Sequence, residues 1–410
     1  MRSFCTILCL VVFSQGLKAD TLRVGTAQQF KTIRSAIAAA QNGDTILVDQ
    51  GTYREQNIVI DKEIVFKGID HPVLDGEKKY EVLSVKANNV VVDGFKVIKS
   101  GVSSIIDMGG IKVYDAEGVT IINNILEETF FGVYIQYGKN CSVINNKLHS
   151  SNRVEQQSGN GIHCWKSDSL LIMGNSITGH RDGMYFEFAT NSSIVGNTSL
   201  QNIRYGLHFM FSHNNFYISN VFTGNGAGVA VMYSRSVKMF NNHFDENWGD
   251  AAYGLLLKEI TDSYIEGNTF ERNTIGIYME GASRINISRN QFLKNGWAMK
   301  MQASCMDLEV RRNNFVGNTF DVGTNGSLVL NHFANNYWDK YEGYDINRDR
   351  VGDIPYRPVS LYAMIIEQNP PAMILFRSFM ASLLDKTEKV LPSITPENLK
   401  DDTPFMKPIL

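Results

Sequence analysis

Residues 205–220, YGLHFMFSHNNFYISN, contain one copy of the pattern that decides the fold of this chain. The stretch begins as an alternating strand, in which every second side chain lies on the same face. Between its apolar residues lie an imidazole, His208, and a thioether, Met210, which are unusual choices for a face that only meets water. The apolar residues of the alternation, expected on the core face, are Leu207, Phe209 and Phe211.

The glycine and the last asparagine of this stretch belong to two ladders that run along the chain. The glycines each lie 14 residues before an asparagine, and this offset is kept over seven turns, so the chain repeats one structural unit. The glycine ladder is Gly132, Gly161, Gly183, Gly206, Gly228, Gly254 and Gly276. The asparagine ladder, with steps of 22 to 29 residues, is Asn124, Asn146, Asn175, Asn197, Asn220, Asn242, Asn268, Asn290, Asn313 and Asn336.

A period in the low twenties is shared by leucine-rich repeats and parallel β-helices. The leucine pattern of the former is missing here, and short β-prone runs separated by Gly and Asn take its place. We therefore expect an all-β fold, a right-handed single-stranded parallel β-helix with about 22 residues per coil. Asparagine side chains are expected to hydrogen-bond from coil to coil, as stacked amide ladders do.

The glycines also predict which side chains point out of this β-helix. Residues one and three positions after each glycine are apolar and belong in the core, so residues two and four positions after it form outward columns, with members about 4.8 Å apart between coils. The first column is Tyr134, His163, Tyr185, His208, Ala230, Leu256 and Tyr278. The second column is Gln136, Trp165, Glu187, Met210, Met232, Lys258 and Glu280.

Aromatic, His and Met side chains on this outer face indicate that something covers it. Two insertions, at 149–160 and 245–253, follow the asparagine ladder on one edge and predict loops that wall a groove. Protein docking is the first use of this groove, because a docking surface needs no ligand geometry. The partner-binding residues on this face would be Trp165, Tyr185, Glu187, His208, Met210 and Met232.

Two other uses of the groove stay open. Met210 and Met232 stack on adjacent coils beside His208, and Met and His ligands suit Cu(I), so a transient copper contact is one hypothesis. His163 lies two coils from His208, roughly 10 Å away, and would join only after rearrangement. The other use is to bind or cleave a polysaccharide. Cleavage needs two facing carboxylates, and Glu187 has only Asp182 within conceivable reach, so we expect no enzyme.

Both ends of the stack need a cover, because an open coil exposes its core and an unpaired edge. A short helix with one apolar face is expected to close the N-terminal end, before a first strand at 45–48. The β-helix with this cap spans 20–338. The apolar face of the helix consists of Phe30, Ile33, Ile37 and Ala40.

The repeat stops at the last asparagine of the ladder. Residues 339–366 are a polar, Asp-rich loop at the end of the β-helix, and 367–410 hold a helix and an arm. The helix is expected at 371–390, after a proline pair, with Phe376 and Phe379 on a broad apolar surface. It either caps the last coil or docks onto a membrane protein or a bilayer surface. The final residues look like an arm or a disordered end.

The loop segment DINRDRVGD contains oxygen ligands at positions 1, 3, 5 and 9, the spacing of a calcium loop. Its sixth position is Arg350 rather than glycine, and its twelfth is Tyr356 rather than glutamate. A structural calcium ion and a hydrogen-bonded turn are therefore both open. The candidate ligands are Asp345, Asn347, Asp349 and Asp353.

The N-terminal residues predict export. Residues 1–19 have an apolar run too short to span a bilayer and end in a small residue, as a signal peptide does, although an uncleaved anchor is the alternative. Without them the net charge of −3 becomes about −5, which makes a nucleic-acid partner unfavourable. The remaining cysteines are odd in number and unrelated in position, and are expected as buried thiols: Cys141, Cys164 and Cys305.

Three segments resemble a known family. GLHFMFSHNN, VAVMYSRSVKMFNNHF and NNYWDKYEGYDINRDRVGDIPYRPVSLY are similar to the NosD family of periplasmic maturation proteins of nitrous oxide reductase. The resemblance covers essentially the whole mature chain. It implies a non-enzymatic β-helix that works with an ABC-type membrane permease and a cytoplasmic ATPase. Together they would supply copper or sulfur to the copper-sulfide site of the reductase, with a periplasmic copper chaperone as a further partner. The resemblance carries over no metal ligands.

Overall fold

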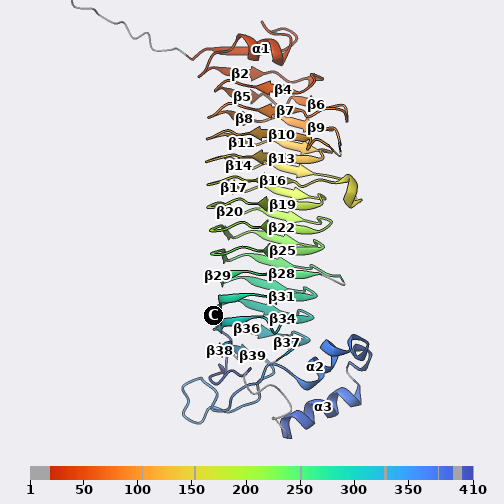
Figure 1. The fold of residues 1–410 in the computed structure, drawn as a ribbon, viewed down its shortest axis with the longest axis vertical. Helices are drawn as coiled ribbons and strands as arrows, with labels where there is room; N and C mark the ends of the chain where they lie inside the picture. The colour runs from red at the N-terminus through yellow and green to blue at the C-terminus, as the bar shows by residue number, and fades with distance from the viewer. Residues whose placement is uncertain are drawn as a thin grey trace, which may run out of the picture.

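The chain forms an elongated column of stacked coils with helices at both ends (Figure 1). The computed structural model describes residues 19–103, 105–151, 154–249, 252–326, 330–376, 378–390 and 399–409. Every strand-to-strand ladder between the described strands is parallel, and each coil contributes to up to three sheets, so the fold is the predicted single-stranded parallel β-helix. A coil takes about 23 residues. The predicted signal peptide lies almost wholly outside the described residues.

Sheet A has 14 strands in the described part of the chain. They are β1 (Thr21–Val24), β2 (Thr45–Val48), β5 (Val65–Gly68), β8 (Val91–Asp93), β11 (Thr120–Ile122), β14 (Ser142–Ile144), β17 (Leu171–Met173), β20 (Ser193–Val195), β23 (Phe216–Ile218), β26 (Lys238–Phe240), β29 (Thr261–Glu266), β32 (Ser283–Ser288), β35 (Met306–Arg311) and β38 (His332–Ala334).

Sheet B has 13 described strands. They are β3 (Thr52–Tyr53), β6 (Val73–Asp75), β9 (Lys96–Ile98), β12 (Ile125–Glu127), β15 (Lys147–His149), β18 (Ser176–Thr178), β21 (Thr198–Leu200), β24 (Val221–Thr223), β27 (His243–Asp245), β30 (Thr269–Glu271), β33 (Gln291–Leu293), β36 (Asn314–Val316) and β39 (Tyr337–Trp338).

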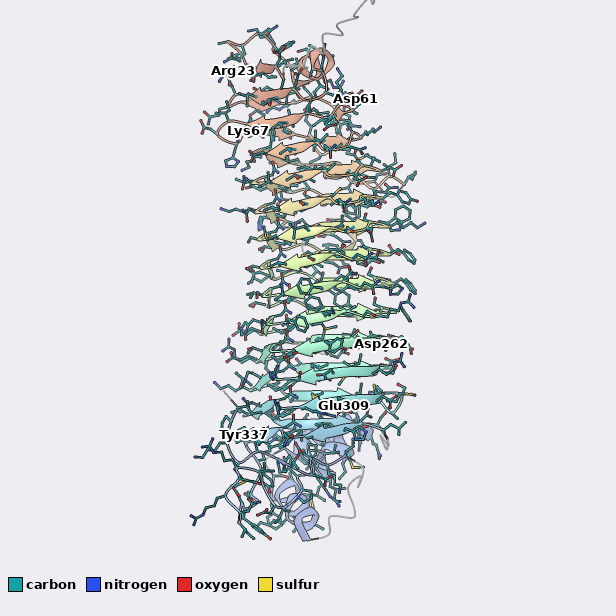
Figure 2. The ribbon with its side chains drawn as sticks, turned by 90° about the vertical axis from the view of Figure 1, so that its left-hand side faces the viewer. Arg23, Asp61, Lys67, Asp262, Glu309 and Tyr337 are labelled. Carbon is teal, nitrogen blue, oxygen red and sulfur yellow. The ribbon has the colours of Figure 1, made fainter. Side chains whose placement is uncertain are left out.

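Sheet C has 12 described strands and carries the candidate site. They are β4 (Ile58–Ile60), β7 (Leu83–Val85), β10 (Gly109–Tyr114), β13 (Phe131–Gln136), β16 (Ile162–Trp165), β19 (Asp182–Glu187), β22 (Tyr205–Met210), β25 (Ala227–Met232), β28 (Tyr253–Lys258), β31 (Ile275–Glu280), β34 (Trp297–Met301) and β37 (Phe320–Thr324). In all three sheets, successive strands stay in line along the column. The labelled residues Lys67, Asp262 and Tyr337 lie at successive positions along it in Figure 2.

The predicted asparagine ladder is present inside the β-helix. At each step from Asn124 to Asn336, the backbone N–H and the side-chain Nδ2 of one asparagine donate to the Oδ1 of the next, at 2.9–3.0 Å. The bonds satisfy turn amides that are buried away from water. The sequence analysis missed a second such ladder, formed by Asn202, Asn225, Asn247, Asn273, Asn295 and Asn318.

The core residues match the glycine register. The residues one and three positions after each glycine of the ladder are buried, as Leu207 and Phe209 show. The three cysteines predicted as buried thiols are free and buried, and burial raises the pKa of each thiol.

The N-terminal cap is present, but the predicted first strand is wrong. The helix α1 (Ile33–Ala39) buries Ile33 and Ile37 against the first coil. A strand of four residues, β1, precedes the helix and pairs in parallel with β2. The first strand therefore lies before the helix, and the predicted strand at 45–48 is the second.

The predicted helix over 371–390 is two elements. Residues after the proline pair form a 3₁₀ helix, η2 (Pro370–Leu375), and the α-helix α3 begins only at Phe379. A further helix, α2 (Leu361–Gln368), precedes them and packs on the outer face of the last strands of sheet C. The helix α2 was not predicted, because most of it lies within the segment 339–366 expected as a polar loop.

The last coil is closed by the end of the chain. Asp401 is fully buried and takes the next place in the asparagine ladder, since its Oδ2 accepts from Asn336 N, Asn336 Nδ2 and Trp338 Nε1 at 2.9, 3.0 and 3.1 Å. Leu399 is buried in the main core, and the chain runs back to bond Asn314 through Ile409. Residues 399–409 are therefore an ordered part of the cap, and the expected disordered end is wrong for this segment.

Candidate functional site

The outer face of sheet C brings the predicted columns together. In the strand register Tyr185 pairs with both His163 and His208, and Met210 pairs with Met232. The register also places Trp165 beside Glu187. His163 and His208 are therefore separated by a whole strand, as expected, while Met210 and Met232 are direct neighbours.

The two histidines point away from the core, but they are not exposed. His163 is 8% and His208 is 4% exposed. The reason is a stack of rings along the column, in which Tyr185 lies 5.0 Å from His163 and 4.8 Å from His208 between ring centroids. Tyr134 and Tyr205 close the stack at 4.5 and 4.8 Å from the nearer histidine. The expectation that both imidazoles face an open groove is therefore corrected.

Three ring nitrogens of these buried imidazoles lack a hydrogen-bond partner among the described residues, whereas His163 Nδ1 lies 3.3 Å from Asn160 Nδ2. The three are Nε2 of His163 and both ring nitrogens of His208. Burial lowers the pKa of His163 to about 3, so its ring is neutral at physiological pH. Burial also raises the pKa of Tyr185 to about 12, with Glu187 and Asp182 adding to the effect, so its hydroxyl stays protonated. Unpartnered, buried nitrogens in native proteins call for an explanation such as a ligand.

A buried ion pair lies beside His208. The carboxylate of Asp182 is fully buried and accepts two hydrogen bonds from Arg204, each 3.1 Å long. His208 Nδ1 lies 3.5 Å from the same carboxylate. Arg204 also reaches Glu155, at 3.4 Å, on the short helix η1 (Glu155–Gln157) of the first insertion. The first predicted loop is thus fastened to this face.

The sequence analysis missed that the residue before each glycine also points outward. Asp182 and Tyr205 occupy this position in their coils. In most other coils this position is apolar or aromatic, as in Phe131, Tyr253 and Ile275. A sequence signal existed, since Asp182 is the only charged residue among the seven that precede the glycines of the ladder.

The carboxylate pair considered for sugar cleavage is not formed. Asp182 and Glu187 lie at opposite ends of β19, five residues apart, which is roughly 16 Å in an extended strand. Glycosidases place their two carboxylates about 5–9.5 Å apart. Asp182 is moreover held by Arg204. Asp182 therefore cannot serve as the second carboxylate beside Glu187 in this reaction.

The methionine residues of this face are more exposed than its histidines. Met210 and Met232 are half-buried, as are Trp165, Tyr185 and Glu187.

One strip of exposed aromatic rings borders these methionines. Phe211 stacks on Phe188 and on Tyr233, with ring centroids 5.2 and 5.0 Å apart. Each of the three residues follows the end of its strand with a left-handed backbone, φ 50–52°, which points the ring outward. Phe211 was expected on the core face, and its 40% exposure corrects that expectation. The strand ends one residue earlier than the apolar alternation suggested.

The second insertion, at 245–253, lies only partly within the described residues. Trp248 in the second insertion is exposed, and residues 250–251 lie outside the described residues. A cavity of about 1120 Å³ lies elsewhere, at the C-terminal end, where Phe320, Asp321, Tyr356 and Phe376 are among its lining residues. The loop-walled groove stays a prediction.

The predicted calcium loop uses its oxygens internally. Asp345 accepts from the backbone N–H groups of Asp349 and Arg350 at 3.1 and 2.8 Å. Asn347 accepts from Asp349 N, and Asp353 accepts from Ile346 N at 2.7 Å. Asp349 in turn accepts from Val351 N. This is the hydrogen-bonded turn that was the alternative to a calcium ion.

The C-terminal helices leave an apolar surface in solvent. Phe379 on α3 is 81% exposed, and Met380 and Ile374 are exposed beside it in sequence. Phe376 is also exposed, although its ring lies 6.1 Å from that of Phe320 in the last coil. Among the described helices, none has the length and hydropathy to span a bilayer.

Fold and site together define a β-helix protein with a soft-ligand face on one sheet and an apolar tail. The sequence model of the family described as periplasmic copper-binding protein (NosD) matches residues 145–350, half of the chain. The chain therefore belongs to the NosD family, as the resemblance of its segments implied.

Two relatives carry the same name. A protein of Stutzerimonas stutzeri named as a probable ABC transporter binding protein NosD is 27% identical over 355 residues, 82% of this chain and 80% of its own length. A protein of Pseudomonas aeruginosa with the same name is 27% identical over 370 residues, 86% of both chains.

Solved structures share the fold at low identity. The A-module of the mannuronan C-5 epimerase AlgE4 of Azotobacter vinelandii aligns with a TM-score of 0.54 at 15% identity, over 74% of this chain and 90% of that chain. The catalytic unit of an α-1,3-glucanase of Streptomyces thermodiastaticus aligns with a TM-score of 0.53 at 13% identity, over 75% of this chain and 62% of that chain. These likenesses concern the β-helix alone.

Proposed function

We propose that this chain is a periplasmic, non-enzymatic accessory protein that receives copper and helps to deliver it to the copper-sulfide site of nitrous oxide reductase. Membership of a family described as periplasmic and copper-binding supports the location and the cargo. The relatives named as ABC transporter binding proteins support work with an ABC-type permease and its cytoplasmic ATPase. A periplasmic copper chaperone and the reductase are the proposed partners on either side of the transfer.

The observation that carries the proposal is the set formed by His208, Met210 and Met232. Two half-buried thioethers lie on adjacent strands next to a buried imidazole with no hydrogen-bond partner. Thioether and imidazole ligands select Cu(I) over harder ions. The set fits copper as transient cargo, because its methionines are partly exposed.

Partner proteins would dock on the exposed strip of Phe188, Phe211 and Tyr233. Rigid aromatic side chains with part of their area exposed are common anchors of protein interfaces. The strip borders the methionines, so a protein seated there would cover the copper set and exclude water from it. Trp165 and Glu187 lie further along the same face and belong to the proposed contact.

Cu(I) titration of the mature protein against a colorimetric competitor tests the copper set. The double variant Met210→Leu/Met232→Leu keeps the volume and removes both sulfurs, and we expect its Kd for Cu(I) to rise at least tenfold. His208→Asn should weaken binding further. The matched control is Met173→Leu/Met306→Leu, because both methionines are exposed on sheet A. Equal Cu(I) affinity in both double variants would reject the set.

A further inference from the structure

A second group of potential metal ligands lies on sheet B. Among the described residues, one set of His, Cys, Asp or Glu side chains brings three ligand atoms within 4.8 Å of one another, and it consists of His243, Asp245 and Glu271. His243 and Asp245 lie two residues apart on β27, hence on one face, and Glu271 lies opposite Asp245 on β30. Two paired strands of a continuous sheet therefore hold the set.

Only one of the two carboxylate oxygens of Asp245 accepts a hydrogen bond from the described residues. Asp245 is 9% exposed, and its Oδ2 accepts a 2.7 Å hydrogen bond from Arg272. Its Oδ1 is buried and has no hydrogen-bond partner. A buried carboxylate oxygen without a partner is costly, and a bound cation is one way to satisfy it.

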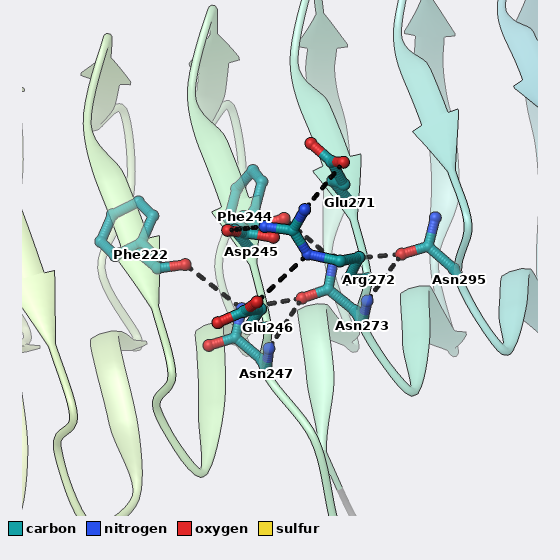
Figure 3. Close-up of polar contacts among 9 residues, drawn as sticks. All are labelled: Phe222, Phe244, Asp245, Glu246, Asn247, Glu271, Arg272, Asn273 and Asn295. Atoms are coloured by element: carbon teal, nitrogen blue, oxygen red, sulfur yellow. Dashed lines mark hydrogen bonds and ion pairs between the residues drawn. The ribbon is translucent and has the colours of Figure 1, made fainter.

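The charged groups around this cluster carry a net negative charge. Figure 3 shows the guanidinium of Arg272 between the carboxylates of Asp245, Glu246 and Glu271. The contacts to Glu246 and Glu271 are 3.2 and 3.1 Å long. One positive and three negative groups leave a net charge of about −2, which one divalent ion would balance. Arg272 engages one oxygen of each carboxylate, as an outer partner that orients metal-ligating carboxylates does.

We propose that His243, Asp245 and Glu271 bind one divalent transition-metal ion of the Zn²⁺ or Cu²⁺ kind. One imidazole nitrogen and two carboxylate oxygens suit these ions, whereas Cu(I) prefers thioether and thiolate ligands. The imidazole disfavours Ca²⁺ and Mg²⁺, which take oxygen ligands. The site lies on a different sheet from the methionines, so it is independent of the copper set on sheet C and does not rest on the proposed function.

Zn²⁺ titration of the mature protein by isothermal calorimetry tests this site, because thioethers bind Zn²⁺ poorly. We expect one site in the wild type, with Kd raised at least tenfold in His243→Ala and in Glu271→Gln. His332→Ala is the control, since His332 is an exposed imidazole on sheet A. The variant Met210→Leu/Met232→Leu should bind Zn²⁺ like the wild type.

Cu²⁺ gives a second readout of the same site. The electron paramagnetic resonance spectrum of one bound Cu²⁺ should show coupling to a single nitrogen that is lost in His243→Ala. Circular dichroism of each variant establishes that the β-helix is intact. If the wild type binds no Zn²⁺, or if both variants bind it as tightly as the wild type, the cluster is an ion-pair network and the proposal is rejected.

Discussion

The imidazole of His180 stands where the following coils have asparagine. Its backbone N–H donates to Asn202 Oδ1 at 3.0 Å, as the asparagines of the second ladder do to one another. Its two ring nitrogens are buried without a hydrogen-bond partner. Burial, with a smaller effect of His149, lowers the pKa of His180 to about 3. The ring is therefore neutral in the folded protein over most of the pH range.

This histidine makes the fold sensitive to acid. Above pH 6.5 both the folded and the unfolded states hold neutral His180, so it contributes no pH dependence. Below pH 6.5 the unfolded state binds a proton at His180, whereas the folded state binds it only near pH 3. The free energy of unfolding therefore decreases as the pH is lowered. At pH 5 the loss from this residue is about 2 kcal/mol.

His180→Asn should remove that part of the acid sensitivity. Chemical denaturation at pH 8 and pH 5 measures it, and the variant should lose about 2 kcal/mol less than the wild type between the two values. The exposed His332→Ala should lose as much as the wild type. An unchanged pH dependence in His180→Asn would show that the ring is protonated in the folded state.

The helix α3 exposes apolar side chains of the kind that a helix normally buries. Ala381 on α3 is buried against α2 and the last coils, while Phe379 on α3 and Ile374 on η2 lie in solvent. The end of the β-helix is closed by residues 399–409 instead, so closing the stack does not use this apolar surface. Both roles left open by the sequence stay predictions, and we propose docking onto the permease because this apolar surface is exposed.

Replacing exposed apolar side chains of the tail should weaken contact with the permease. The variant Ile374→Ser/Phe379→Ser removes area from the surface without touching the buried side, so the fold should be kept. We expect at least a tenfold loss of co-purification with the permease. Ile346→Ser is the control, because Ile346 is equally exposed in the loop before these helices. Retention of the permease by the tail variant would exclude this docking mode.

Periodicity predicted the coils but not their ends. The spacing of Gly206 and Asn220 gave the register and the core residues, because each repeat meets only its neighbours. It misplaced Phe211, since apolar alternation cannot show where a left-handed turn residue ends the strand. It could not show that Asp182 meets Arg204, because a buried ion pair between coils leaves no periodic trace. The pairing of Asn336 with Asp401 spans 65 residues and was likewise beyond local pattern.

The closure of the last coil stabilises the C-terminal end of the column. Asp401 supplies one acceptor oxygen to three buried donors on Asn336 and Trp338. Removing it leaves those donors without a partner, which costs roughly 1–3 kcal/mol for a buried group. Because the stability of stacked coils is a sum of neighbour terms, the loss should be confined to the coils nearest the C-terminus.

Asp401→Ala tests this closure. Hydrogen exchange should speed up at least tenfold in β36, β38 and β39 and stay unchanged in the coils around β10, and the fluorescence of the buried Trp338 should shift to the red. Asp402→Ala is the matched control, because Asp402 is exposed and next in the chain. A uniform loss of protection along the column would mean that the coils unfold together, against the neighbour-sum picture.

The place of Asp401 also sets the order in which the protein can be completed. A chain made from its N-terminus can form α1 and add coils as they emerge, each on the edge left by the one before. The final edge then stays open, with the amides of Asn336 unsatisfied, until residue 401 has appeared. A chain truncated before residue 401 therefore presents an unpaired β-edge. Such an edge promotes aggregation and can be recognised by quality-control proteases.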